Sequence, residues 1–425
     1  MIEVTPTKPL QPQPQLLRGG AAFFPALVTA IDGAAYWVQL ETYIFDFHGV
    51  GADVAEALLR AARRGLTVQV LVDGIGTAPL AAEWQEKLQT AGVHWQVYSP
   101  LTGNWPGLGL VRPDRWRRLH RKLCVVDQDL VFCGGINVLD DYYDPTHGAL
   151  AAPRFDFTVA LHGPVAEAAS EAMALLWWRV QAGYSARRHH LAEAWDAFKA
   201  AGYGGRISAA HLARRRALAL SGRPAGAKMS KTLPTARAAL LLRDNLLNRN
   251  IIERAYRKAI GQARQEILIA NAYFVPGGRL RRALIKAARR GVKVTLLLQG
   301  RYEYFMQYHA TRPVYGALLD AGVEIHEYEA SFLHAKVAVV DGHWATVGSS
   351  NLDPLSLLLA REANVVLDDQ VFAEDLRARL LAAIASHGRR VDITEYNGRP
   401  WRQRLLDLAA YALMRLALLL AGQRY

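Results

Sequence analysis

Two hydrophobic periods alternate along the first part of the chain. Residues 21–34 form an apolar-rich helical segment, and residues 35–45 alternate apolar and polar positions as a β-strand does. A second helical pattern runs through residues 61–64 and stops at Gly65, and residues 67–72 follow as another apolar strand. Strand, helix and strand in this order predict parallel pairing within an α/β layer.

The second part of the chain repeats this order. A strand pattern covers residues 266–274, a helical pattern covers 280–290 and stops at Gly291, and a strand pattern covers 292–298. Short runs also recur at matching places: AARRG at 61–65 returns at 287–291, and AGV at 91–93 returns at 321–323. The chain is therefore expected to contain two similar α/β halves that arose by internal duplication.

The pattern also predicts segment boundaries. We expect a polar N-terminal lead-in, a first half, a helical and basic connector, a second half and a C-terminal amphipathic helix, at residues 1–20, 21–164, 165–240, 241–395 and 396–425. The lead-in is rich in Pro and Gln and has no apolar core of a signal peptide, so the protein is expected to stay in the cytoplasm. An insertion at residues 101–116, rich in Gly, Pro and Trp, is expected near the mouth of any site.

The C-terminal helical pattern, residues 404–421, is apolar except for a narrow polar face of Arg404, Asp407, Tyr411 and Arg415. A membrane-spanning helix would need about 20 apolar residues, and Asp407 and Arg415 interrupt this one. The pattern favours a helix that lies in a membrane interface. Packing on the protein's own core, or on another subunit, is the alternative.

Composition describes a globular protein with an anionic partner. Of its 425 residues, 51% are hydrophobic and 21% charged, and the formal net charge is +13. Such a charge favours nucleic acid, anionic lipid headgroups or a phosphate-bearing substrate. Cys124 and Cys133 are expected to be small buried core residues on adjacent strands.

One motif occurs twice with the same spacing. HRKLCVVD at 120–127 is followed after six residues by GGIN at 134–137, and HAKVAVVD at 334–341 is followed after six residues by GSSN at 348–351. With five residue types fixed, a start position matches by chance on the order of 10⁻⁶. The shared residues are His120, Lys122, Asp127, Gly134 and Asn137 in the first copy, and His334, Lys336, Asp341, Gly348 and Asn351 in the second.

These residue types suit chemistry on a phosphodiester. Attack on this anion needs a nucleophile, charge neutralisation at the non-bridging oxygens and a proton for the leaving alkoxide. Two imidazoles, two lysines and two asparagines provide all three without a metal or cofactor. Histidine and lysine two positions apart on a strand share one face. The phosphoryl oxygens are expected to meet Lys122, Lys336, Asn137, Asn351, Gly134, Gly348 and the Ser349 hydroxyl.

The doubled pattern resembles the signature of the phospholipase D superfamily, in which two such half-sites build one active site. The resemblance implies two similar halves, each a mixed β-sheet flanked by helices, related by a pseudo-twofold with the site between them. It implies that one histidine, His120, attacks phosphorus to form a phospho-histidine, and that His334 acts as acid and base.

The resemblance also implies a carboxylate behind each imidazole. Glu362, beyond the second motif, is the expected partner there, and Asp156 is the candidate for the first half. Asp127 and Asp341 belong to the catalytic motif, but their place at strand ends indicates support of the fold rather than chemistry.

Within the superfamily the chain resembles the shorter bacterial cardiolipin synthases, most densely at residues 243–368. This implies transfer of a phosphatidyl group from phosphatidylglycerol to a second phospholipid, with phosphatidylglycerol and phosphatidylethanolamine as the lipid partners. The place implied is the cytoplasmic face of the bacterial cell membrane, held peripherally. Gly135 stands where the second motif has Ser349, and LAR at 359–361 precedes Glu362 where the resemblance leads us to expect an Asn and an apolar residue.

Other functions remain open from the sequence. A phospholipase D-type hydrolase, or a phosphodiesterase that cuts nucleic acid, would use the same two histidines, and the basic composition suits DNA. The apolar C-terminal helix argues against nucleic acid, and intact motifs argue against a non-catalytic scaffold. Zinc is disfavoured because no His, Cys and carboxylate group has ligand spacing and the lysines would repel a cation.

Overall fold

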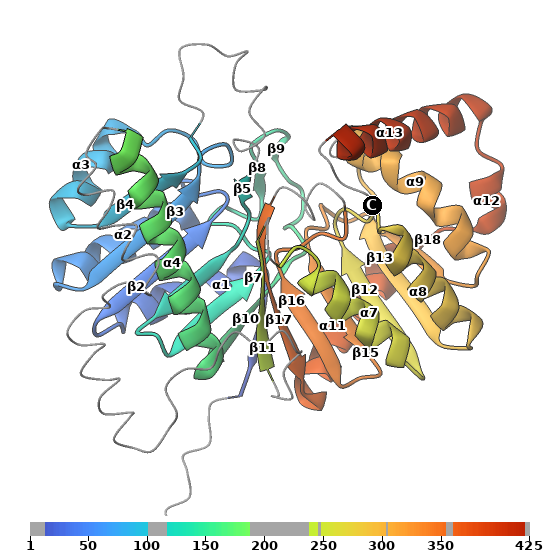
Figure 1. Ribbon diagram of the computed structural model, residues 1–425, viewed down its shortest axis with the longest axis horizontal. Helices are drawn as coiled ribbons and strands as arrows, with labels where there is room; N and C mark the ends of the chain where they lie inside the picture. The colour runs from blue at the N-terminus through green and yellow to red at the C-terminus, as the bar shows by residue number, and fades with distance from the viewer. Residues whose placement is uncertain are drawn as a thin grey trace, which may run out of the picture.

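The computed structural model describes residues 13–100, 117–187, 238–244, 248–302, 305–353 and 360–420. The predicted insertion at 101–116 and most of the basic connector lie outside these ranges. Within them the chain forms two α/β halves that stand side by side (Figure 1).

The first half is built on a seven-stranded mixed sheet with the order β1-β10-β7-β6-β2-β3-β4. Its strands are β1 (Gln15–Arg18), β2 (Trp37–Thr42), β3 (Thr67–Asp73), β4 (His94–Tyr98), β6 (Leu123–Val126), β7 (Leu130–Gly134) and β10 (Phe157–His162). The neighbours β2, β3 and β4 run parallel. The remaining neighbours, which are β2 with β6, β6 with β7, β7 with β10 and β10 with β1, pair antiparallel. The predicted parallel pair and the mixed sheet are both confirmed.

The second half repeats this order from β11 to β14 and adds β18 at the edge, which gives β11-β17-β16-β15-β12-β13-β14-β18. Its strands are β11 (Ala238–Arg243), β12 (Glu266–Asn271), β13 (Lys293–Gln299), β14 (Glu324–Tyr328), β15 (Lys336–Val340), β16 (Trp344–Gly348), β17 (Ala360–Asp368) and β18 (Gly388–Arg390). β5 (Arg118–Leu119) leaves the first half and pairs with β17. The same order in both sheets confirms the internal duplication.

Helices cover both faces of each sheet. In the first half α1 (Gly19–Asp32), α2 (Val50–Arg63) and α3 (Ala82–Ala91) enclose one apolar core, and α4 (Pro164–Arg187) covers the other face. In the second half α7 (Ile251–Gln262), α8 (Gly278–Arg289) and α9 (Phe305–Leu319) enclose one core, and α11 (Gln370–His387) covers the other face. A third core joins the halves, because it contains residues of α4, α11 and both sheets.

Two equivalent glycines end equivalent helices. Gly65 after α2 and Gly291 after α8 have φ values of +87° and +89°, a left-handed conformation that costs glycine little. The helix stops predicted at these positions are confirmed. Cys124 on β6 and Cys133 on β7 are buried and free, as expected.

Three predicted boundaries were wrong. β1 lies inside the supposed polar lead-in, because an edge strand with only Leu16 and Leu17 buried has too short a pattern to detect. α4 belongs to the first half rather than to the connector, since Ser170 donates a hydrogen bond to Gln39 of β2 at 2.8 Å. β11 begins the second half at Ala238, before the expected residue 241.

The chain closes with α12 (Ile393–Asn397) and α13 (Trp401–Leu420), and α13 packs against α9. The C-terminal helix therefore rests on the protein's own second half, which was the alternative expectation. A small hairpin, β8 (Tyr143–Asp144) with β9 (Gly148–Ala149), stands at the same end of the molecule as α13 (Figure 1). Among the helices in the described ranges, none is both long and apolar enough to cross a membrane.

Candidate active site

The two motif histidines lie where the halves meet. The backbone N–H of His120 donates to the carbonyl of Arg361 on β17 at 3.0 Å, and that of His334 donates to the carbonyl of Phe155 in the first half at 2.9 Å. Each histidine thus belongs to a short extended segment that crosses to the other half. The prediction that both residues of each His-Lys pair lie on a strand was wrong, because β6 begins after Lys122 and β15 begins at Lys336.

The residue before each histidine donates its backbone N–H to a side chain at the end of a parallel strand. Asp73, the last residue of β3, accepts from the backbone N–H of Leu119 at 2.8 Å. Gln299, the last residue of β13, accepts from the N–H of Leu333 at 3.2 Å. Both were missed in the sequence, although they occupy equivalent places at the ends of repeated strands.

The carboxylates behind the imidazoles are exchanged between the halves. Nδ1 of His120 lies 3.0 Å and 3.1 Å from the two carboxylate oxygens of Glu362, in the second half. Nδ1 of His334 lies 2.7 Å from Oδ2 of Asp156, in the first half. Each carboxylate contacts an imidazole, but the assignment of each to its own half was wrong; that the carboxylates orient the rings stays a prediction. With Nδ1 engaged, Nε2 of each ring is the atom left to meet a substrate.

The difference between Gly135 and Ser349 follows from these carboxylates. A Cβ on Gly135 would lie 2.4 Å from Oδ1 of Asp156, so only glycine fits beside that carboxylate. At the equivalent place, the Ser349 hydroxyl donates to Glu362 and accepts from the N–H of Ala363 at 3.0 Å. Ser349 is fully buried. It was expected to bind the substrate phosphate, and the structure corrects this: it holds Glu362.

The two lysines are buried beside the histidines. Nζ of Lys122 donates to the carbonyl of His120 at 3.0 Å, and Nζ of Lys336 donates in the same way to the carbonyl of His334. Burial lowers the pKa of Lys122 to about 7, against the opposing effect of the Glu362 carboxylate. Two ammonium groups in one buried site favour binding of an anion.

The lysines and the protein interior act on the imidazoles. Burial lowers the pKa of His120, and Glu362 opposes the effect. Burial, then Lys336 and Lys122, hold the pKa of His334 well below its usual range, while burial raises the pKa of Asp156 to about 7. The side chains of His120 and His334 are still 17% and 18% exposed, so both can be reached from solvent. Such a site holds neutral imidazoles until an anion enters.

Comparison with known proteins agrees with this geometry. Residues 27–148 and 256–383 match the family described as "Cardiolipin synthase, PLD-like domain". The chain belongs to this phospholipase D-like family. It is 37% identical to cardiolipin synthase B of Escherichia coli over 94% of this chain and 87% of that protein, and 28% identical to cardiolipin synthase A of Cronobacter sakazakii over 94% and 74%.

A solved structure shows the same fold at low identity. Phosphatidylserine synthase of Haemophilus influenzae matches with a TM-score of 0.65 and 16% identity, over 96% of both chains. The fold of two phospholipase D-like halves, each a mixed sheet flanked by helices, is thus shared along the whole length.

Two motif glycines of the phospholipase D-like site serve the sheets. A Cβ on Gly134 would lie 2.3 Å from Oγ1 of Thr158 on β10, and one on Gly348 would lie 2.3 Å from Cγ of Asn364 on β17. Neighbouring strands thus occupy the space that a side chain at either position would need, and contact of these glycines with a phosphate stays a prediction.

The motif aspartates lie at the far end of their strands. Asp127 accepts from the N–H groups of Ala35, Tyr36 and Trp37, each at 2.8 Å. Asp341 accepts from those of Arg264, Gln265 and Glu266 at 2.8 to 2.9 Å. Each carboxylate therefore ties the start of β2 or β12 to the end of the neighbouring strand. This confirms the expectation that they support the fold, although their motif is catalytic.

Asn137 and Asn351 follow the motif glycines. Oδ1 of Asn137 accepts from the N–H of Ile44 at 3.2 Å, which leaves its NH₂ group as the donor for a phosphoryl oxygen. Asn351 is buried. Their contact with a phosphate stays a prediction.

An aromatic ring distinguishes the two halves. The ring of Tyr43 lies 5.0 Å from that of His120 and 5.4 Å from Nζ of Lys122. Its equivalent after β12 is Ala272, so His334 has no such neighbour at that place. Tyr43 was missed because it follows a strand without belonging to either motif.

Proposed function

We propose that this protein transfers the phosphatidyl group of phosphatidylglycerol to the hydroxyl of a second phosphatidylglycerol, which yields cardiolipin and glycerol. Membership of the family makes phosphatidyl transfer between phospholipids its chemistry. The observation that carries the proposal is the exchange of carboxylates: His120 with Glu362 and His334 with Asp156 form one site from two halves.

In the first step, Nε2 of His120 attacks phosphorus. The Nε2–P bond forms, the bond from phosphorus to the glycerol oxygen breaks, and His334 gives its Nε2 proton to that oxygen. His334 must be protonated here, and the entering phosphate supports this because its negative charge opposes the two lysines that lower the pKa of His334.

In the second step the acceptor hydroxyl attacks the phospho-histidine. His334 takes the hydroxyl proton, the new P–O bond forms and the Nε2–P bond breaks, so both imidazoles return to their first state. Lys122, Lys336, Asn137 and Asn351 are proposed to donate to the phosphoryl oxygens throughout.

His120 is the better nucleophile by charge. An imidazole that bonds to phosphorus becomes cationic. Burial lowers the pKa of His120, but the Glu362 carboxylate beside Nδ1 opposes this effect and favours positive charge there. At His334, burial and the charges of Lys336 and Lys122 oppose a proton, which makes its proton easy to give away.

The proposal places the protein at the cytoplasmic face of the cell membrane, held peripherally. Its substrates lie in an anionic bilayer, and the net charge of +13 favours that surface. Phosphatidylethanolamine is proposed as a second lipid partner.

The decisive experiment is mass spectrometry of products from purified protein in mixed micelles with phosphatidylglycerol and EDTA, with and without phosphatidylethanolamine. Cardiolipin and glycerol are expected, and His120→Ala or His334→Ala should abolish both products while the protein stays folded. Phosphatidic acid alone would identify a hydrolase. The absence of any lipid product, with cleavage of DNA, would identify a nuclease.

A further inference from the structure

Helix α13 buries the aspartate of its polar face and exposes several of its leucines. Asp407, in the middle of this apolar helix, is 1% exposed, and Ala410 and Met414 on the same stripe are also buried. On the opposite stripe, Leu405, Leu408 and Leu416 are 59%, 55% and 51% exposed. A surface helix of a soluble protein normally does the reverse.

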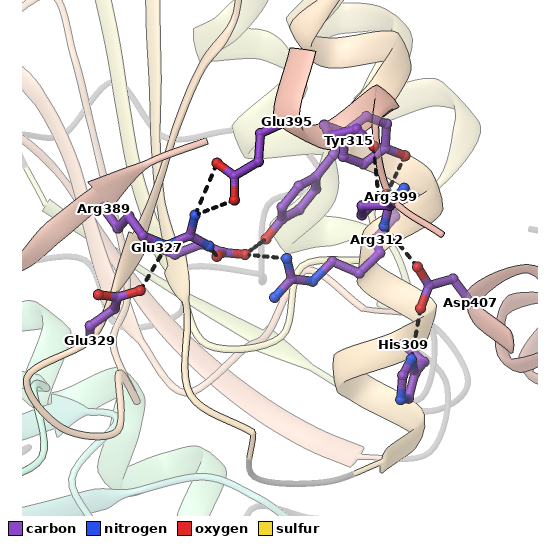
Figure 2. Close-up of polar contacts among 10 residues, drawn as sticks. His309, Arg312, Tyr315, Glu327, Glu329, Arg389, Glu395, Arg399 and Asp407 are labelled. Carbon is purple, nitrogen blue, oxygen red and sulfur yellow. Dashed lines mark hydrogen bonds and ion pairs between the residues drawn. The ribbon is translucent and has the colours of Figure 1, made fainter. Parts of the chain in front are cut away.

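Buried charges hold the helix in this orientation (Figure 2). Oδ1 of Asp407 lies 2.7 Å from Nδ1 of His309 on α9, and Oδ2 accepts from Arg399 at 2.8 Å. The guanidinium of Arg399 lies over the ring of Tyr396 at 3.8 Å, and the Tyr396 hydroxyl donates to the carbonyl of Arg312 at 2.8 Å. An aspartate that is paired twice under a helix cannot turn outward without leaving both partners unpaired.

The cluster continues into the sheet, so the helix is fixed to the body of the second half. Arg312 forms an ion pair with Glu327 on β14 at 2.8 Å, and Arg389 on β18 binds the same carboxylate from the other side (Figure 2). Tyr315 donates to Glu327 at 3.3 Å. The leucine face is therefore a fixed feature of the surface.

Exposed aromatic rings also occur near α9 and at the β8–β9 hairpin. Tyr302 and Phe305 follow β13, whose last residue holds the segment before His334, and Phe305 lies 4.6 Å from the ring of His309. Tyr142 and Tyr143 are exposed at the β8–β9 hairpin, which stands at the same end of the molecule as α13 (Figure 1).

We propose that these residues form one docking face that inserts into the bilayer holding the substrate: the leucines of α13 with Trp401, Tyr302, Phe305, Tyr142 and Tyr143. The inference rests on the proposed function for the identity of the lipid. Arg402 and Arg404 are exposed beside Trp401, and this combination of leucines, tryptophan and arginines fits an anionic interface, whereas like charges would repel in a contact between two copies.

The test compares leucine and control variants in a vesicle sedimentation assay. Leu405→Ser, Leu408→Ser and Leu416→Ser are combined in one protein. Val371→Ser with Tyr36→Ser serves as the control, since these two residues are more exposed than the leucines but lie elsewhere. The leucine variant should bind vesicles of phosphatidylglycerol and phosphatidylcholine at least about tenfold more weakly, because inserted apolar area is lost. It should keep its circular dichroism and its activity in detergent micelles.

Each other outcome has a definite meaning. If the leucine variant binds vesicles as tightly as the starting protein, the proposal is overturned. It is also overturned if the starting protein forms a dimer that the leucine substitutions dissociate while vesicle binding is unchanged. Asp407→Asn weakens the contacts of Asp407 with His309 and Arg399 without changing the leucines, and this variant should also bind vesicles more weakly. If the unchanged protein binds vesicles but makes no lipid product in micelles, the docking face stands and the proposed function fails.

Discussion

At the scale of residues, two histidine–carboxylate pairs share one geometry and differ in charge. Burial raises the pKa of Asp156 to about 7, and burial lowers the pKa of His120 while the Glu362 carboxylate opposes that effect. In the proposed mechanism the His120–Glu362 pair would stabilise the cationic phospho-imidazole, and the His334–Asp156 pair would handle the proton.

The assignment can be checked by trapping the intermediate. With a phosphatidyl donor labelled at its phosphorus whose leaving group needs no proton, such as phosphatidyl-p-nitrophenol, His334→Ala should accumulate acid-labile labelled protein, because His120 can attack without a general acid while breakdown lacks its base. His120→Ala should remain unlabelled. The measurement is gel autoradiography after acid-free quenching. Label on His120→Ala and none on His334→Ala would reverse the roles.

Burial of Lys122 should lower the free energy of unfolding, although the side chain is expected to take part in catalysis. Its pKa is about 7 in the fold and 10.5 in the unfolded chain, so the unfolded state binds more protons between those values. The penalty is thus fully present below pH 7 and disappears as pH rises through 10.5. We expect Lys122→Met to be inactive and to melt a few degrees higher at pH 7, with a smaller gain at pH 10.

Thermal unfolding by circular dichroism at the two pH values measures this difference. Lys87→Met provides the control, because Lys87 is a surface residue paired with Glu83. A gain for Lys122→Met that stays constant with pH would contradict the lowered pKa.

At the scale of elements, each motif aspartate joins two neighbouring strands through hydrogen bonds of its side chain. Asp127 and Asp341 both have φ of +50° and each accepts three backbone N–H groups. Because three donors lose their acceptor, Asp127→Ala and Asp341→Ala should each lower the free energy of unfolding by about 2–4 kcal/mol.

Urea denaturation measures that loss, and the activity of the folded fraction in micelles completes the test. Both variants should keep most of their activity per folded molecule at low temperature. A complete loss of activity in a fully folded variant would return these aspartates to the chemistry.

The elements also show which parts of the fold can be predicted from the sequence. Periodicity and repeated runs predicted β2, β3, β12 and β13 and the helix stops at Gly65 and Gly291, because these features depend on neighbours in the chain. The exchange of Glu362 and Asp156 could not be predicted, since spacing within one half says nothing about contacts across the interface. The orientation of α13 was hidden for a similar reason: its polar stripe is visible, but its partners His309 and Arg399 are known only from the packing.

At the scale of the whole molecule, one hydrophobic core is shared by the two repeated halves and holds them together. Val131, Cys133 and Phe157 of the first sheet lie in one cluster with Val347 and Val365 of the second, completed by side chains of α4 and α11. Neither half buries this surface alone. Each histidine also depends on a carboxylate from the other half, so stability and catalysis require the same interface.

A single cooperative unfolding transition should therefore describe both halves. Urea curves followed by far-ultraviolet circular dichroism, by tryptophan fluorescence and by residual transfer activity should share one midpoint, with a slope that reflects the surface of the whole chain. Val347→Ala, in the shared core, should shift all three curves together by a loss of about 2 kcal/mol. Separate midpoints for activity and circular dichroism would mean that the halves part before they unfold, and that the shared core is weaker than its burial implies.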